Sequence, residues 1–211
     1  MPVLMDVLGA IVIGGIVLIL LITFNFQITE SAERQMYERF MTEHIEEATK
    51  QLNYVVGMAG IGIEDPTLAV HTADEDLFVF KSMWDHLHYQ LGDVSTDPFP
   101  QYVSIKVYDS ENALSPVSEQ FGKVLEIRND QFATDPASQS LIEPLGFIFW
   151  VDDLRFRYYD INDAQTSTPA DVRAVELLLS FRRDPPRLGG RDLTNRVQMK
   201  CYLMNPYMND K

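Results

Sequence analysis

Residues 7–29 read VLGAIVIGGIVLILLITFNFQIT, twenty-three consecutive positions without Asp, Glu, Lys or Arg. A helix that crosses the hydrocarbon core of a bilayer needs about 20 mostly apolar residues, so this segment is long enough to span a membrane. It is longer than the apolar core of a cleaved secretory signal, and neither basic residues before it nor a small-residue cleavage site after it mark such a signal. The stretch predicts a single-pass anchor or a helix with a more specific role.

A second helical pattern follows this segment without a break. From Ile28 onward apolar residues recur at steps of mostly three or four, and no Pro or Gly occurs between Ile16 and Val56. We therefore expect one helix from about residue 3 to about residue 57, roughly 80 Å long, with its apolar stripe beneath the chain's own globular domain. The apolar positions are Ile28, Ala32, Met36, Phe40, Met41, Ile45, Ala48, Leu52, Val55, Val56 and Ala59.

The chain beyond this helix predicts a β-rich domain. Gly57, Gly60, Gly62 and Pro66 end the helix. Residues 162–171 and 184–191 have the composition of loops, and residues 77–91 fit either strand or helix. The predicted fold class is α+β, with an apolar helical segment (1–29), its amphipathic continuation (30–58) and an antiparallel β-domain (59–211). The expected strands are residues 102–109, 123–128, 145–151, 154–159, 172–182 and 196–203.

The overall charge of the chain limits its partners. It has 31 acidic and 17 basic residues, a formal net charge of −14, which argues against nucleic acid as a general surface partner. Arg182, Arg183, Arg187 and Arg191 cluster in sequence, and we interpret them as a solvated loop. The single cysteine, Cys201, cannot form a disulfide within the chain, and its place in an expected strand favours a buried, inert thiol.

Motifs of catalysis are absent from the sequence. It has no G-x-S-x-G, P-loop, H-E-x-x-H or C-x-x-C motif, so we expect no enzymatic activity. His86 and His88 would share one face of a strand and could ligate a metal, but no cysteine or third histidine accompanies them, so we interpret them as surface or structural residues. We therefore expect no cofactor, with calcium as the one candidate.

Two polar runs near residue 165 are candidate sites. Asp160, Asn162 and Asp163 supply oxygens of the kind that calcium prefers, although the EF-hand spacing is absent and an Asx turn explains them more simply. The loop that follows contains hydroxyl side chains that could carry O-linked sugars outside the cell. These are Thr166, Ser167 and Thr168.

The apolar segment has one acidic residue at its head and small residues inside it. Asp6 either lies in the headgroup zone or pairs with the terminal amine of a neighbouring subunit, because an unpaired carboxylate in lipid is costly. Gly14 and Gly15 allow either close helix packing in a membrane or local unwinding during assembly. The sequence leaves both pairs of alternatives open.

Three stretches together carry a family resemblance. LNYVVGMAGIGI (52–63) is similar to a long helix that ends at an alanine–glycine pair. VDDLRFRYYDIN (151–162) is similar to a strand whose aromatic pair precedes an Asp and a polar turn, and DVRAVELLLSFRR (171–183) to the strand after that turn. With the apolar N-terminus, the chain resembles type IV pilins and type II secretion pseudopilins, above all the larger W-class minor pilins and J-class pseudopilins.

The resemblance implies a structural subunit that assembles into an extracellular filament. It implies that Asp6, which is fifth once Met1 is removed, matches the acidic residue, usually Glu, that neutralises the terminal amine of the adjoining subunit. It also implies copies of the chain and the inner-membrane assembly machinery as partners, with the inner membrane as the location before assembly and an extracellular pilus afterwards. The expected filament-core residues are Val7, Ile11, Leu18, Leu21 and Phe24.

Two alternatives stay open from the sequence. The chain could be a minor pilin or pseudopilin that primes a pilus or a type II secretion system. It could also belong to another class, a membrane-anchored binding or sensor module that never polymerises. Filaments of the family serve adhesion, motility, DNA uptake or secretion.

Overall fold

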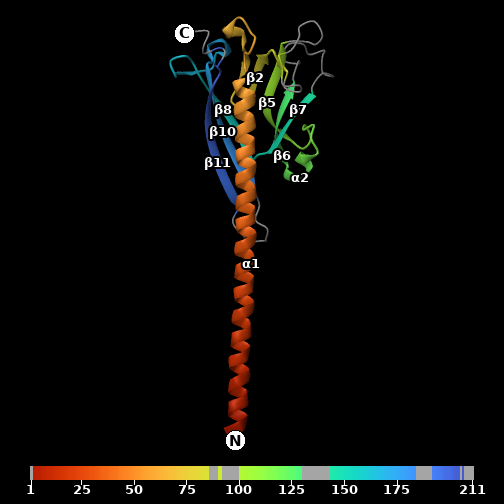
Figure 1. Cartoon of the computed structure of the whole chain (residues 1–211), viewed down its shortest axis with the longest axis vertical. Coiled ribbons are helices and arrows are strands. Elements are labelled where there is room, and N and C mark those ends of the chain that lie inside the picture. Colours follow the sequence, from red (N-terminus) through yellow and green to blue (C-terminus); the bar gives the residue numbers. More distant parts are fainter. Residues whose placement is uncertain are drawn as a thin grey trace.

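One long helix dominates the architecture. The computed structural model describes residues 2–85, 90–91, 100–129, 143–183, 192–204 and 206. Helix α1 (Pro2–Gly57) runs for 56 residues and projects far beyond the rest of the chain (Figure 1). This confirms the helix predicted over residues 3–57. Because no Pro or Gly interrupts residues 16–56, the backbone hydrogen bonds continue from the apolar half into the amphipathic half.

Glycines reverse the chain after α1. Gly60 and Gly62 have φ angles of 76° and 73°, a conformation that side chains other than glycine rarely adopt. A Cβ on Gly62 would also lie 2.6 Å from the Cβ of Met83. Both the backbone conformation and the packing therefore require glycine at this turn. The short helix η1 (Pro66–Leu68) follows the turn.

The first sheet has five antiparallel strands in the order β1-β2-β5-β6-β7. Between β5 and β6 lies the short helix α2 (Val117–Phe121). A separate two-stranded pair is formed by β3 (Trp84–Asp85) and β4 (Gln90–Leu91). The five strands are β1 (Val70–Ala73), β2 (Leu77–Ser82), β5 (Gln101–Asp109), β6 (Lys123–Asn129) and β7 (Glu143–Trp150).

The second sheet has four antiparallel strands in the order β11-β10-β8-β9. The short helix η4 (Pro169–Asp171) lies in the connection from β9 to β10. In β8, every second residue from Leu154 is buried, so one face of the sheet packs on the core and the other faces solvent. The four strands are β8 (Asp153–Tyr159), β9 (Gln165–Thr166), β10 (Ala174–Arg183) and β11 (Leu193–Tyr202).

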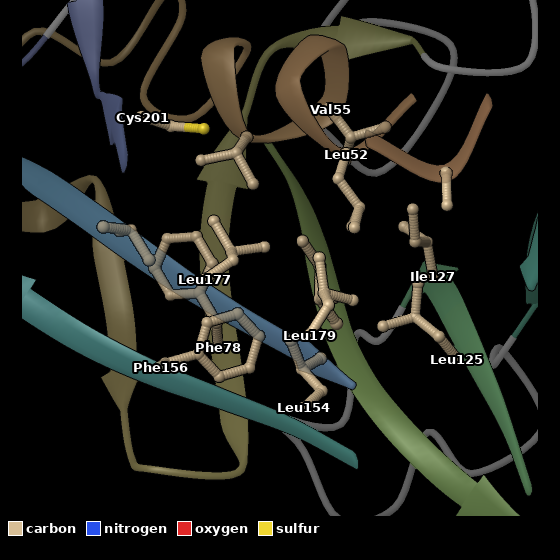
Figure 2. Close-up of a cluster of buried hydrophobic side chains, with 14 of the residues drawn as sticks. Leu52, Val55, Phe78, Leu125, Ile127, Leu154, Phe156, Leu177, Leu179 and Cys201 are labelled. Carbon is tan, nitrogen blue, oxygen red and sulfur yellow. The ribbon is translucent and has the colours of Figure 1, made fainter. Parts of the chain in front are cut away.

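The core lies between the C-terminal half of α1 and the two sheets. Figure 2 shows Leu52 and Val55 of α1 pointing into the space bounded by Leu177 of β10 and Ile127 of β6. Leu52, Val55, Leu177 and Ile127 have no exposed surface. The sheets are also tied directly, since the hydroxyl of Tyr158 in β8 donates to the carbonyl of Asp74 between β1 and β2 (2.7 Å). The α+β architecture of a long apolar helix and antiparallel sheets is therefore confirmed.

The strand predictions can be compared element by element. Each of the six expected strands overlaps an observed one. Where they are described, the ambiguous residues 77–91 form β2, β3 and β4, with a bend at Met83 between β2 and β3. Residues 162–171 do connect two adjacent antiparallel strands, although the short β9 and η4 lie within them. The sequence did not predict β1 or α2. The loop predicted over residues 184–191, and His86 and His88, lie outside the described residues.

Candidate assembly surface

The N-terminal half of α1 presents its apolar side chains to solvent. Fifteen large apolar side chains between Val7 and Ile28 are each 47–65 % exposed. Among the described residues, α1 is the one helix long and apolar enough to cross a membrane, and its most apolar window, with a mean hydropathy of 2.9, is wholly unburied. All the expected filament-core residues lie on this surface: Val7, Ile11, Leu18, Leu21 and Phe24.

The two glycines of this segment leave space beside the helix. Gly14 and Gly15 lie within α1, and a Cβ on either would meet no other atom within 4 Å. Nothing within one copy therefore requires glycine there, whereas another helix could approach closely at that point. Asp6 also belongs to α1, but its side chain lies outside the described residues.

The described part of the globular domain buries α1 side chains from Met41 onward, and before it Glu33 and Tyr37 are partly buried. Met41 and Ile45 are 5 % and 9 % exposed, and the core-facing residues after them have no exposed surface. In contrast, Met36 and Phe40 are 62 % and 47 % exposed. The prediction that the whole apolar stripe from Ile28 lies beneath the domain is therefore wrong for its first third.

Helix geometry explains where the stripe departs from the domain. Residues spaced by four advance about 40° around a helix of 3.6 residues per turn. Ile28, Ala32, Met36 and Phe40 follow that spacing, which turns them roughly 110° to 170° away from the face that carries Met41. The exposed part of the stripe thus continues the apolar surface of the N-terminal half along the side opposite the domain.

An aromatic cluster surrounds α1 where it enters the domain. The ring of His44 stacks on Trp150 with centroids 4.4 Å apart, and its Nε2–H donates to the carbonyl oxygen of Trp150 (3.1 Å). Phe121 stacks on Trp150 (5.6 Å), and Phe181 meets it edge-on (5.9 Å). We name His44, Phe121, Trp150 and Phe181 the aromatic cluster. It joins α1, α2, β7 and β10 at one level of the helix.

The calcium candidates make contacts within the protein. Asp160 Oδ1 accepts hydrogen bonds from the backbone N–H groups of Asn162 and Ala164, both at 2.8 Å, which is an Asx-type turn. Asp163, at a φ of 62°, accepts from the Lys200 Nζ at 2.8 Å. That hydrogen bond raises the pKa of Lys200. Among the described residues, no group of three His, Cys, Asp or Glu side chains could hold a metal ion.

The candidate glycosylation residues follow β8. Ser167 and Thr168 are exposed, whereas Thr166 is half-buried. Thr166 Oγ1 accepts a hydrogen bond from the N–H of Thr168 at 3.1 Å. The hydroxyls of Ser167 and Thr168 therefore stand in the more accessible positions for attachment of a sugar.

Two shallow hollows of about 380 and 520 Å³ lie on the outer face of the second sheet, and both are lined by Arg155 and Leu178. Arg155 is held by Asp153 (3.1 Å) and Glu75 (3.0 Å). Nearby, a hydrogen bond from Gln198, helped by Tyr159 and Arg157, lowers the pKa of Glu176. The hollows thus present paired ions and amides, an arrangement suited to polar contacts rather than to nucleophilic chemistry.

One structural feature was missed by the sequence reasoning. Glu126 has no exposed surface and pairs with Arg128 at 2.7 Å. The Glu126 carboxylate also accepts from the N–H groups of Leu114 and Ser115 (3.2 and 3.0 Å), which fixes the connection between β5 and β6. In the sequence, Glu126 and Arg128 form a Glu-x-Arg pattern within a predicted strand, where residues two apart share a face, and this pattern could have indicated the ion pair.

Comparison with known proteins adds no relative. No protein-family model matches the chain, and no curated protein or solved structure matches it significantly.

Proposed function

We propose that this chain is a structural subunit of an extracellular filament of the type IV pilus kind, which assembles through α1. The observation that carries the proposal is one unbroken helix, α1. Its N-terminal half exposes its apolar side chains, and its C-terminal half packs against the β-domain. Before assembly, the exposed apolar N-terminal half of α1 is embedded in the inner membrane. In the filament it packs against the same segment of other copies.

The free energy of burying apolar surface favours a state in which the N-terminal half of α1 is shielded from water. Fully burying one large aliphatic or aromatic side chain is worth about 1.5–3 kcal/mol. Fifteen such side chains are about half exposed between Val7 and Ile28, so together they favour a covered state by roughly ten kcal/mol or more. Lipid and a bundle of identical helices both supply that cover. A heterologous contact repeated without closure gives a helical fibre.

The exposed stripe beyond the span favours assembly over a simple anchor. In an anchor that never polymerises, residues after the span face water and gain nothing from apolar side chains. Met36 and Phe40 nevertheless continue the apolar surface past Glu30 and Glu33, on the side of α1 opposite the domain. A neighbouring helix would cover them.

Asp6 is the proposed guide of assembly. At the head of an apolar segment its carboxylate gains most from a positive partner, and the terminal amine of an adjoining copy supplies one. Inner-membrane assembly machinery would draw subunits from the bilayer. A minor subunit or pseudopilin would use the same surfaces.

The test is fractionation of producing cells into sheared filaments and membranes, with the N-terminal peptide identified by mass spectrometry. We expect the unaltered chain in the filament fraction and Asp6→Ala only in the membrane fraction. Glu64→Ala, which removes an exposed carboxylate of the domain, serves as the matched control and should still form filaments.

Each alternative gives a different result. An unaltered chain that stays in the membrane fraction would support the anchored module. Filaments of Asp6→Ala as abundant as those of the unaltered chain would exclude Asp6 from assembly while leaving the helix in place.

A further inference from the structure

The apolar span carries two amide side chains, those of Asn25 and Gln27. The hydroxyls of Thr23 and Thr29 each donate to a backbone carbonyl one turn earlier, at 2.9 Å, so the helix itself satisfies them. The two amides are exposed and make no hydrogen bond within the described part of the chain. Their partners therefore have to come from outside one copy of the helix.

The two amides differ in their access to the lipid headgroups. Asn25 lies about 7.5 Å along the helix before Glu30, the first charged residue after the span, and Gln27 lies about 4.5 Å before it. The Cα–Cβ bond of a helical residue tilts toward the N-terminus, so the short side chain of Asn25 points deeper into the hydrocarbon. The longer side chain of Gln27 starts nearer the headgroups and can reach them. Asn25 cannot, and the hydrocarbon offers its amide no hydrogen bond.

Asn25 selects one face of α1. Nearly every residue of the span is apolar, so spacing alone singles out no face, but an amide without a lipid partner marks the side that needs another polar group. Gln27 lies on the opposite side, because two residues advance 200° around a helix. Asn25 instead shares its side with Met36, eleven residues further on, which is exposed opposite the domain.

A row of residues on this face has the spacing of two packed helices. We define the seam as the positions reached from Asn25 by alternating steps of three and four residues. Its large apolar members are 51–65 % exposed, and a Cβ on Gly14 would meet no other atom within 4 Å. A small residue at that point lets two helices approach closely. The seam consists of Val7, Ile11, Gly14, Leu18, Leu21, Asn25, Ile28 and Ala32.

A second copy of the chain offers the partner that Asn25 lacks. Each copy crosses the membrane once in the proposed embedded state, so copies with the same orientation hold Asn25 at the same depth. An amide has both donors and an acceptor, and two Asn25 side chains can therefore each donate to the other. A lone Asn in the apolar seam of parallel helices is also a device that fixes their register and number.

We propose that two copies pair in the membrane before assembly, parallel and in register along the seam, with their Asn25 amides hydrogen-bonded to each other. The inference rests on the membrane-embedded stage of the proposed function and not on the filament itself. Both copies use the same surface, so the contact closes at two and does not extend into a fibre. Successive copies in a helical fibre are displaced along its axis, which separates the two amides. The pair therefore competes with assembly and comes apart when a copy leaves the membrane.

The experiment is disulfide crosslinking of the full-length chain in isolated membranes, with copper phenanthroline as the oxidant. Cys201→Ser, which keeps a hydrogen-bond donor for Asn53, leaves one thiol in each further variant. Leu21→Cys places that thiol on the seam, and Thr23→Cys places it on the opposite face at nearly the same depth. We expect Leu21→Cys to form a covalent dimer, and Thr23→Cys to form about a tenth as much or less.

Two further variants test the amide itself in the Leu21→Cys chain. Asn25→Leu should reduce the dimer yield about threefold or more, the effect of losing one polar contact between helices in a membrane. Gln27→Leu removes the amide on the opposite face and serves as the matched control, so it should leave the yield unchanged.

The remaining outcomes overturn the pair. Equal dimer yields from Leu21→Cys and Thr23→Cys would exclude the seam as the contact, and a dimer that Asn25→Leu does not diminish would exclude pairing through the amides. The sheared filament fraction of the same cells separates this inference from the proposed function. Dimers without filaments overturn the filament and leave the pair, whereas filaments without dimers overturn the pair alone.

Discussion

Phe40 and Met41 are consecutive residues of α1 with opposite surroundings: Met41 is 5 % exposed and packs in the core, whereas Phe40 is 47 % exposed. The two side chains mark two faces of the helix at this level, one against the chain's own domain and one away from it. Residues on the exposed side serve contacts between copies in the proposed filament, and residues on the buried side stabilise the fold.

This difference between the two faces predicts different effects for two neighbouring substitutions. Met41→Ala should lower the free energy of unfolding by about 2–5 kcal/mol, because it removes a buried side chain and leaves a cavity. Phe40→Ala should change it by about 0.5 kcal/mol or less, yet reduce the filament yield. Denaturant unfolding of the full-length chain in detergent measures the first effect. Equal losses of stability would contradict this assignment of the two faces.

The buried ion pair predicts a strong dependence on both partners. Glu126→Ala should destabilise the protein by about 3–5 kcal/mol, because the Arg128 guanidinium then lies buried without its carboxylate and the N–H groups of Leu114 and Ser115 lose their acceptor. Hydrogen exchange should rise first between β5 and β6. The control Asp153→Ala removes an exposed partner of Arg155 and should cost about 1 kcal/mol at most.

The thiol of Cys201 should be unreactive in the folded protein. Burial raises its pKa from 9.0 to about 11, so the thiolate fraction at pH 8 falls about a hundredfold and alkylation slows accordingly. Because the neutral thiol is favoured on folding, its stabilising effect is full below pH 9 and is lost as the pH rises through 11. Alkylation timed by mass spectrometry, with and without denaturant, tests this; equal rates in both conditions would exclude a buried thiol.

Calcium should have little effect on the β8–β9 turn. Asp160 already binds two backbone N–H groups and Asp163 already holds Lys200, so calcium would have to displace these contacts. We expect millimolar calcium or a chelator to shift the melting temperature of the chain by about 1 °C or less, since a ligand stabilises only as far as it binds the folded state. A clear rise with calcium that Asp160→Asn abolishes would instead establish a site.

The elements predicted well from sequence were those with strong periodicity. The uncharged run and the three- and four-residue spacing located α1 almost to the residue, and the alternating LRFRYY located β8. The short elements β1, α2 and β9 span only 4, 5 and 2 residues, too few to show a period.

The candidate surface could be predicted only in part. The apolar segment was evident from composition, but the point where the domain begins to cover α1 depends on tertiary packing around His44 and Trp150. Likewise, the level of α2 relative to β10 depends on contacts among Phe121, Trp150 and Phe181, which no pattern in the sequence marks.

The unbroken helix also fixes the distance between the apolar span and the level at which the domain encloses α1. With residues 7–28 in a bilayer, Met41 lies 13 residues further along α1, or about 20 Å at 1.5 Å per residue. A charged stalk stiffened by the Arg34–Glu38 and Arg39–Glu43 pairs fills that gap. The level at which the described part of the domain encloses α1 is therefore set about 20 Å beyond the apolar span, because an unbroken helix cannot shorten that distance.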